Sequence, residues 1–159
     1  MLDPKKQKKI ATMVKKHRWS KINKELQKAS PEEKEEFAKE LGYDLHNNSI
    51  NYLLMLLDDP DDNVKLQAIK SLGNHASDTA KTFLQNFLEN LPKEKVELEQ
   101  ATRDSISKIK AALAKKEEWY KARYLKNLRA STIIIPYLST RPRHQSKTSK
   151  SFYIHHIVF

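Results

Sequence analysis

Apolar side chains recur along this chain at the three- and four-residue spacing of α-helices. In residues 56–73, LLDDPDDNVKLQAIKSLG, one apolar run ends at a turn around Pro60 and a second apolar stripe follows. The second stripe consists of Val64, Ala68, Ile69 and Leu72. These residues share one face of a helix. The segment therefore predicts a helix end, a tight turn and a new helix whose apolar side must pack on a neighbour.

Helix start signals surround this unit. Ser30 is followed by Pro31 and, three residues after the serine, by Glu33, which together favour a capped helix start. An apolar helix is expected over residues 51–57. A further helix is expected to begin at Ser77 or Asp78 and to end before Pro92, and the last one to continue from there to about residue 129. Its inner stripe is expected to include Tyr120 and Tyr124.

The helix boundaries upstream of Ser30 and at the two glycines are less regular. Upstream of Ser30 two apolar stripes are out of phase, so either two short helices meet near Trp19 or one long helix bends there. The chain has two glycines, Gly42 and Gly73, and each lies just past a helical run. Because glycine lacks a Cβ, both are predicted to take the left-handed cap conformation.

The apolar stripes also repeat. Residues 53, 56 and 57 fall on residues 84, 87 and 88 at an offset of 31, and the stripe from Val64 to Leu72 falls on residues 101–109 at an offset of 37. Periods of this size are typical of solenoids built from helix pairs, in which each pair must stack on the next. The sequence predicts an all-α repeat domain over about residues 5–129.

Residues 50–75 resemble a HEAT repeat of the short bacterial HEAT-like type. The shared pattern is an apolar first helix, an Asp/Pro turn, Val followed by a basic residue, then Ala, an aliphatic residue and Leu-Gly. The resemblance implies that Asp61 caps the second helix and that Gly73 ends it. It also implies that Lys65 stands where these repeats usually have Arg, and Lys cannot make the planar bidentate contact of Arg. The positions implied to face neighbouring helices are Val64, Ala68, Ile69 and Leu72. The implied fold is a short right-handed α-solenoid of antiparallel helix pairs.

The last 30 residues differ in amino-acid composition from the rest of the chain. Residues 131–159 contain no Asp, Glu, Gly or Ala and carry short apolar runs at 133–135 and 152–159. We interpret residues 130–159 as a weakly structured tail, or as sequence foreign to the natural gene. The alternative is a strand-forming peptide that adds to the sheet edge of a partner.

Charge is segregated along the 159 residues, whose net charge is +10. Residues 1–30 carry ten Lys and Arg against two acids, whereas residues 31–62 carry two against ten. A basic protein favours anionic partners. The acidic block, however, indicates helices whose charges pair with one another.

The residue types argue against catalysis. The acidic run 58–63 lacks the Gly and Glu that a calcium-binding EF-hand loop needs, and no His and Glu share the spacing of a zinc hydrolase. The chain has no cysteine and no Gly-rich phosphate loop. We therefore expect no enzymatic activity, no cofactor and no metal site. With no apolar run of about 18 residues and no secretory signal, we expect a cytoplasmic protein without membrane association.

Binding is the function class that remains. We expect a scaffold that binds a partner protein through exposed helix faces. The alternative is nucleic-acid binding through a basic patch formed by the lysines of residues 5–16 and by residues 121–129. Self-association through an uncapped repeat end is a further possibility. The candidate contact residues are Trp119, Lys121, Arg123, Lys126, Arg129 and Lys65.

Overall fold

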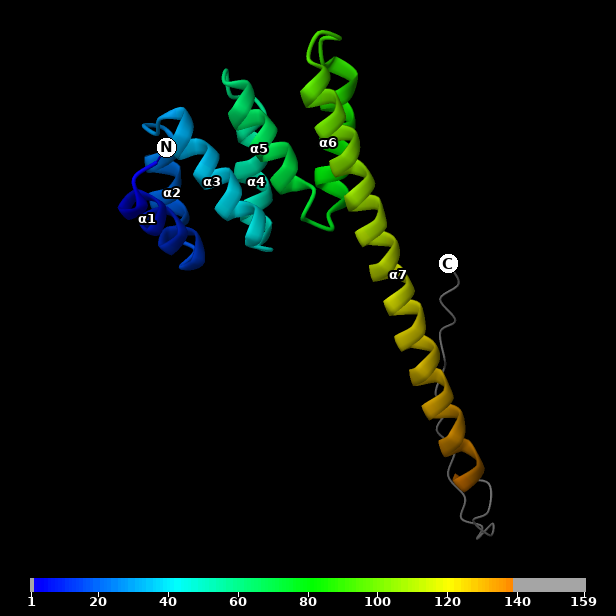
Figure 1. Ribbon diagram of the computed structural model, residues 1–159. Helices are drawn as coiled ribbons and strands as arrows, with labels where there is room; N and C mark the ends of the chain where they lie inside the picture. Colours follow the sequence, from blue (N-terminus) through cyan, green and yellow to red (C-terminus); the bar gives the residue numbers. More distant parts are fainter. Residues whose placement is uncertain (1, 139–159) are drawn as a thin grey trace, which may run out of the picture. The chain divides into compact units, whose positions relative to one another are not determined.

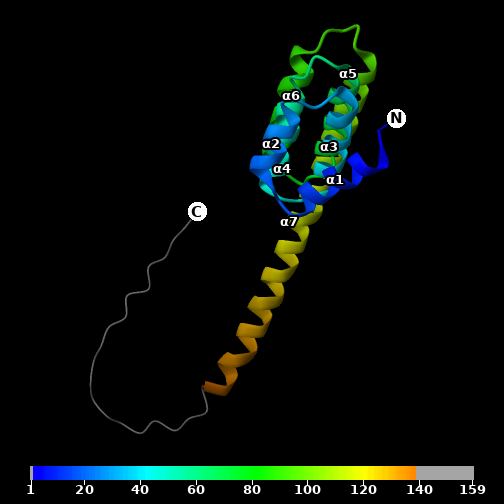
Figure 2. The same cartoon turned by 90° about the vertical axis from the view of Figure 1, so that its left-hand side faces the viewer.

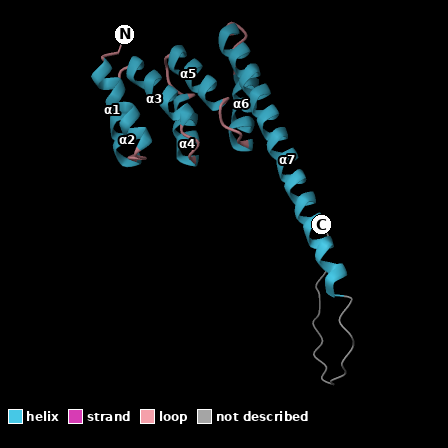
Figure 3. Ribbon diagram, turned by 60° about the horizontal axis from the view of Figure 1, so that its bottom comes forward, coloured by secondary structure: helices cyan, strands magenta, loops and turns pink. Residues whose placement is uncertain are grey.

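The computed structural model describes residues 2–138, with side chains through Leu128, and this part of the chain contains seven α-helices and no strand (Figures 1 and 3). In chain order they are α1 (Pro4–Lys15), α2 (Trp19–Leu26), α3 (Pro31–Tyr43), α4 (Asn47–Leu56), α5 (Asp62–Leu72), α6 (Asp78–Asn90) and α7 (Val96–Leu138). The predicted all-α fold is confirmed. The chain divides into a compact unit, Met1–Trp119, and a second unit that begins at Tyr120.

The helices of the first unit form two layers. In Figure 2, α2, α4 and α6 lie in one layer, and α3, α5 and the first part of α7 lie in the other. Helix α5 packs on α3 of the same layer and on α4 of the opposite layer, while α1 packs on α3. The helices thus form the pairs α2/α3, α4/α5 and α6/α7, and each pair stacks on the next, as the apolar repeat predicted.

Local capping explains where these helices begin. Ser30 and Glu33 form the expected capping box, because the Ser30 side chain accepts from the Glu33 N–H and the Glu33 carboxylate accepts from the Ser30 N–H. Asp61 occupies the N-cap of α5 and accepts from the Asn63 N–H at 2.8 Å. Ser77, rather than Asp78, is the N-cap of α6. Each cap satisfies an N–H that the helix itself leaves unpaired.

The first helical region is two helices, which resolves the alternatives left by the sequence. The turn between α1 and α2 contains His17, whose φ of 48° is left-handed. The Trp19 ring stacks against His17 and Tyr52, with ring centroids 5.2 and 5.9 Å apart. The Tyr52 hydroxyl also donates to the Trp19 carbonyl at 3.1 Å. These contacts join the α1–α2 turn to α4 and stabilise the backbone conformation at His17.

One apolar core runs through the stacked pairs. Val64, Ala68, Ile69 and Leu72 of α5 are all fully buried, together with Phe37 and Leu41 of α3 and Leu53 of α4. Helix α5 packs on α3 and on its partner α4, and Gly73 at its end contacts Ser105 of α7. A single pair could not bury this stripe alone, which is why the fold requires stacking.

The two glycines serve close packing between helices, and the prediction of left-handed caps was wrong. Neither glycine has a positive φ. A Cβ on Gly42 would lie 2.6 Å from the Ser71 Cβ, and a Cβ on Gly73 would lie 2.9 Å from the Ser105 Oγ. Each glycine thus lets the second helix of one pair approach the second helix of the next pair.

The same contacts fix the repeat register. Since Ser71 faces Gly42 and Ser105 faces Gly73, the two serines are equivalent. Helices α5 and α7 likewise begin 34 residues apart, at Asp62 and Val96. The predicted offset of 37 for the second helices is therefore wrong by about one helical turn, whereas α4 and α6 keep the predicted offset of 31.

Helix α7 continues to Leu138, beyond its expected end near residue 129, so residues 130–138 are helical. Tyr120 and Tyr124 are 55% and 65% exposed, so the expected inner stripe does not remain buried past Leu113. The rest of the expected tail, residues 139–159, lies outside the described residues. None of the described helices combines the length and the apolar character needed to cross a membrane.

Candidate functional site

Lysine–aspartate pairs connect successive turns of the stack. Lys34 of α3 donates to Asp59 of the α4–α5 turn at 2.6 Å, and Lys95, just before α7, pairs with Asp62 at the start of α5. Lys65 itself lies 3.8 Å from Asp62 of its own helix. The contact between the α4–α5 turn and the α6–α7 turn is therefore made by Lys95, while Lys65 stays within its own helix.

Asp59 is the buried member of this set. Burial alone would raise the pKa of its carboxyl, but hydrogen bonds from Lys34 and from the Asp61 N–H hold it below the ordinary value. The Lys34 side chain is 24% exposed and that of Asp59 is 8% exposed. This pair therefore contributes more to holding the first two repeat pairs together than a solvated surface pair would.

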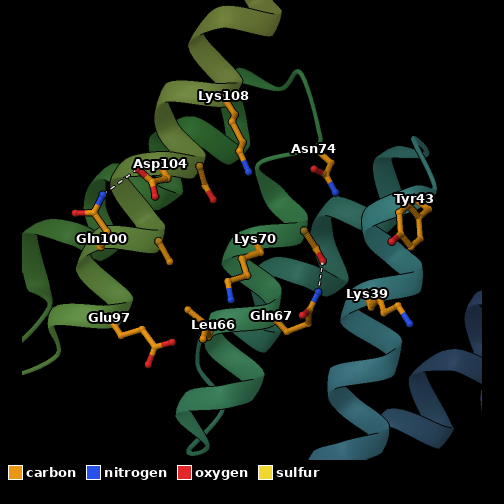
Figure 4. Close-up of a pocket in the computed structure, with 13 residues that line it drawn as sticks. Lys39, Tyr43, Leu66, Gln67, Lys70, Asn74, Glu97, Gln100, Asp104 and Lys108 are labelled. Atoms are coloured by element: carbon orange, nitrogen blue, oxygen red, sulfur yellow. Dashed lines mark hydrogen bonds between the residues drawn. The ribbon is translucent and has the colours of Figure 1, made fainter.

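A groove of about 440 Å³ lies on the layer formed by α3, α5 and α7 (Figure 4). Its lining residues are Lys39, Tyr43, Leu66, Gln67, Lys70, Ser71, Asn74, Glu97, Gln100, Ala101, Asp104, Ser105 and Lys108. Three successive second helices contribute to it, and each belongs to a different repeat pair. The groove is thus a product of stacking, and no single pair contains it.

The groove side chains form two rows that cross the helices. The first row stands eight residues after the start of each helix and consists of Lys39, Lys70 and Asp104. The second row stands twelve residues after the start and consists of Tyr43, Asn74 and Lys108. All six side chains are exposed. The rows follow from the shared register of the three helices.

Hydrogen bonds hold the groove floor in place. The Asn74 Nδ2 donates to the Gly42 carbonyl at 3.4 Å, and His75 Nε2 lies 3.2 Å from the Leu41 carbonyl. Both contacts satisfy carbonyls at the C-terminal end of α3. Gln67 donates to the Ser71 hydroxyl at 3.3 Å. The floor is therefore fixed relative to the α3 wall before any ligand binds.

Charges of both signs face the groove. Lys39 pairs with Glu36 of its own helix at 3.4 Å, an exposed contact, while Lys70 makes no ion pair within the described part of the chain. On the opposite wall, Asp104 accepts from Gln100 at 3.0 Å and Glu97 adds a second carboxylate. The α3–α5 side is thus basic, and the α7 side carries two acids and one base, Lys108.

The contact residues expected from the sequence do not line this groove. Lys65 lines a different hollow, at the α4–α5 and α6–α7 turns, together with Lys95. Trp119 is 53% exposed at the end of the first unit, and Lys121 is exposed in the second unit. Arg123 and Lys126 are exposed in the second unit as well, and the side chain of Arg129 lies outside those described.

The groove residues carry no local signal in the sequence. They are polar residues of ordinary type, such as Lys70 and Asp104, and no motif marks them. The signal that could have found them is their equal distance from the helix starts, which requires the correct repeat offset. An offset of 37 places Lys70 over Ser107, which is not among the lining residues.

Two lysines of the basic N-terminal segment pair with acids. Lys6 pairs with Glu33 of the acidic block at 2.7 Å, and Lys9 pairs with Glu25 of its own segment at 3.1 Å. The hydrogen bond from Lys6 lowers the pKa of the Glu33 carboxyl. Other lysines of α1 are exposed. In the described residues no group of three His, Asp or Glu is arranged to hold a metal ion.

Polar residues occupy the C-terminal end of the stack. Arg103 of α7 is equivalent to the fully buried Ile69 of α5, and it is exposed and bonded to Glu99 at 2.8 Å. Gln85 of α6 is equivalent to the half-buried Leu54 of α4. Both line a shallow hollow between α6 and α7. Terminal repeats with a polar outer face are the usual way to end such a stack.

Paired antiparallel helices in two layers, joined by Lys–Asp contacts between turns, define a helical-repeat protein of the solenoid class. The sequence matches the family model of HEAT repeats over residues 21–102, which is more than half of the chain. The chain therefore belongs to the HEAT-repeat family. Comparison with curated proteins gave no match, and comparison with solved structures gave none either.

Proposed function

We propose that this protein is a non-enzymatic scaffold and that it binds a partner protein in the groove formed by α3, α5 and α7. The observation that carries the proposal is the groove itself, because three successive repeat pairs contribute exposed side chains to one continuous hollow. Proteins of the HEAT-repeat family generally mediate protein interactions, which supports a binding role.

The chemistry of the groove supports a peptide or protein ligand. Leu66 and Tyr43 offer apolar surface, and Gln67, Gln100 and Asn74 offer amide groups that both donate and accept hydrogen bonds. Such a mixture of apolar and hydrogen-bonding groups matches the composition of protein interfaces. The fixed floor lowers the entropy that would be lost on binding.

Nucleic-acid binding remains the alternative, and the groove gives it less support. The groove contains three lysines, but its two carboxylates, Glu97 and Asp104, would repel a phosphate backbone along the α7 wall. Lys6 and Lys9 on α1 already pair with acids. If the exposed lysines of α1 and of residues 121–126 bound nucleic acid, affinity would fall steeply between 50 and 200 mM salt.

Site-specific crosslinking tests the proposal. A photo-reactive amino acid at Gln100, which lines the groove, is expected to capture a partner protein in cells of the source organism. The same amino acid at Asn51, exposed on the opposite layer, serves as the matched control. The captured protein is then purified and its affinity measured with the wild type and with Lys70→Glu. Capture at both positions alike, or equal affinity for Lys70→Glu, would contradict the proposal.

A further inference from the structure

We infer that the groove selects a segment in the polyproline II conformation with the charge pattern acid-x-x-acid-x-x-base, read in either chain direction. The inference rests on the proposed binding function and goes beyond it, because it names the chemistry of the bound segment. The first row of the groove, which consists of Lys39, Lys70 and Asp104, carries it.

The three side chains occupy equivalent positions in successive repeats. Each stands eight residues after the first residue of its helix. The Gly42–Ser71 and Gly73–Ser105 contacts hold these helices in matching register. All three side chains line the same groove. A segment that crosses the three helices therefore meets Lys39, then Lys70 and then Asp104.

The spacing of the charges follows from helix packing. Neighbouring helices pack with their axes about 8–10 Å apart. A segment in the polyproline II conformation rises about 3.1 Å per residue and has three residues per turn, so its side chains three positions apart lie on one face, about 9 Å from one another. Side chains three positions apart on the ligand therefore face successive members of the row. This gives two acids opposite the lysines and one base opposite Asp104.

The two-signed pattern follows from the distribution of charge. Lys70 has no ion-pair partner within the described residues, and Lys39 has only an exposed contact at 3.4 Å. The ammonium groups of both lysines can pair with carboxylates of a ligand. Asp104 and Glu97 both line the α7 wall, about two helical turns apart, and Lys108 lines it one turn after Asp104. An acid at the third position would be repelled there, whereas Arg or Lys would be attracted.

Leu66 indicates where an apolar residue fits. It stands one turn before Lys70 on α5, lines the groove and is half-buried (Figure 4). It is therefore the apolar part of the groove floor beside the central lysine. An apolar residue next to the central acid of the ligand would cover it.

Fluorescent peptide libraries test the inference on the full chain. One library fixes Glu, Glu and Arg at positions i, i+3 and i+6, and a second fixes Arg, Glu and Glu, which covers the opposite chain direction. Control libraries fix Glu at all three positions, fix Arg at all three, or keep two Glu and one Arg at spacings of two. At low salt, one two-signed library is expected to bind at least tenfold more tightly than every control library.

Charge-reversal variants connect this binding to the groove. Lys70→Glu and Asp104→Lys are each expected to weaken the preferred library at least tenfold. Lys21→Glu on α2 and Glu94→Lys before α7, both exposed and outside the groove, are the matched controls and are expected to leave its affinity unchanged. Thermal unfolding of every variant checks that it is folded.

Three outcomes would overturn the inference. They are equal or tighter binding of the all-Glu library, binding that the groove variants do not change, and no binding by either two-signed library. None of these contradicts the proposed function if a crosslinker at Gln100 still captures a partner. Failure of the crosslinking experiment, by contrast, would remove both proposals.

Discussion

At the scale of single residues, small side chains set the distance between repeat pairs. Gly42 and Ser71 lie in direct contact, so Gly42→Ala adds a Cβ where the Ser71 Cβ lies 2.6 Å away. We expect a loss of about 1–3 kcal/mol from overpacking, reduced by up to about 1 kcal/mol because Ala favours helix over Gly. Adding Ser71→Gly should restore stability, and urea unfolding of both single variants and the double variant measures the coupling. Additive effects would mean that this contact does not limit the approach of α3 and α5.

His75 is the residue with the clearest expected pH effect. Its side chain is 2% exposed, and burial lowers its pKa although the Leu41 carbonyl opposes this change. The His75 imidazole therefore binds a proton more readily in the unfolded state than in the folded state. The stability that comes from burying the neutral imidazole is fully present above about pH 6.5 and is lost as the pH falls below that value. Between pH 7.5 and 5.5 the wild type should therefore lose more thermal stability than His75→Gln, whose amide keeps the donor to Leu41. Equal losses would show that His75 is not the titrating group.

At the scale of helices and turns, the Lys34–Asp59 pair connects α3 to the α4–α5 turn. Lys34→Met leaves a mostly buried carboxylate without its ammonium partner, and we expect a loss of about 1–3 kcal/mol. Lys81→Met provides the control, because its partner Asp78 is 74% exposed and such pairs contribute about 0–1 kcal/mol. The urea midpoints of the two variants measure this difference. An equally large loss for Lys81→Met would show that the buried Lys34–Asp59 pair contributes no more to stability than an exposed pair does.

Helix boundaries show which elements the sequence could predict. Ser30, Asp61 and Ser77 act within three residues of themselves, so their caps could be read from the local sequence. The cap conformations assigned to Gly42 and Gly73 were wrong because their role depends on serines about 30 residues away. The end of α7 was also missed, since nothing in the apolar stripe indicates that the helix continues to Leu138.

At the scale of the whole molecule, the polar C-terminal end of the stack bears on self-association. Arg103 and Gln85 stand where earlier repeats carry Ile69 and Leu54. Replacing them, Arg103→Ile with Gln85→Leu, restores the apolar pattern of an internal repeat face. We expect this double variant to associate more strongly than the wild type in sedimentation velocity, because exposed apolar repeat faces stack. A double variant that associates less than the wild type would show that this end already mediates self-association.

The sequence by itself determined most of the helices, the N-caps at Ser30 and Asp61, the need for stacking and the family, because these depend on residues within one or two helical turns and on a pattern that recurs. Only the tertiary structure decided which residues form the groove. A shift of three residues is close to one helical turn and leaves an apolar stripe on the same face. The stripe therefore fits offsets of 34 and 37 almost equally well. Contact between Gly73 and Ser105 selects 34 and thereby places Lys70 beside Asp104.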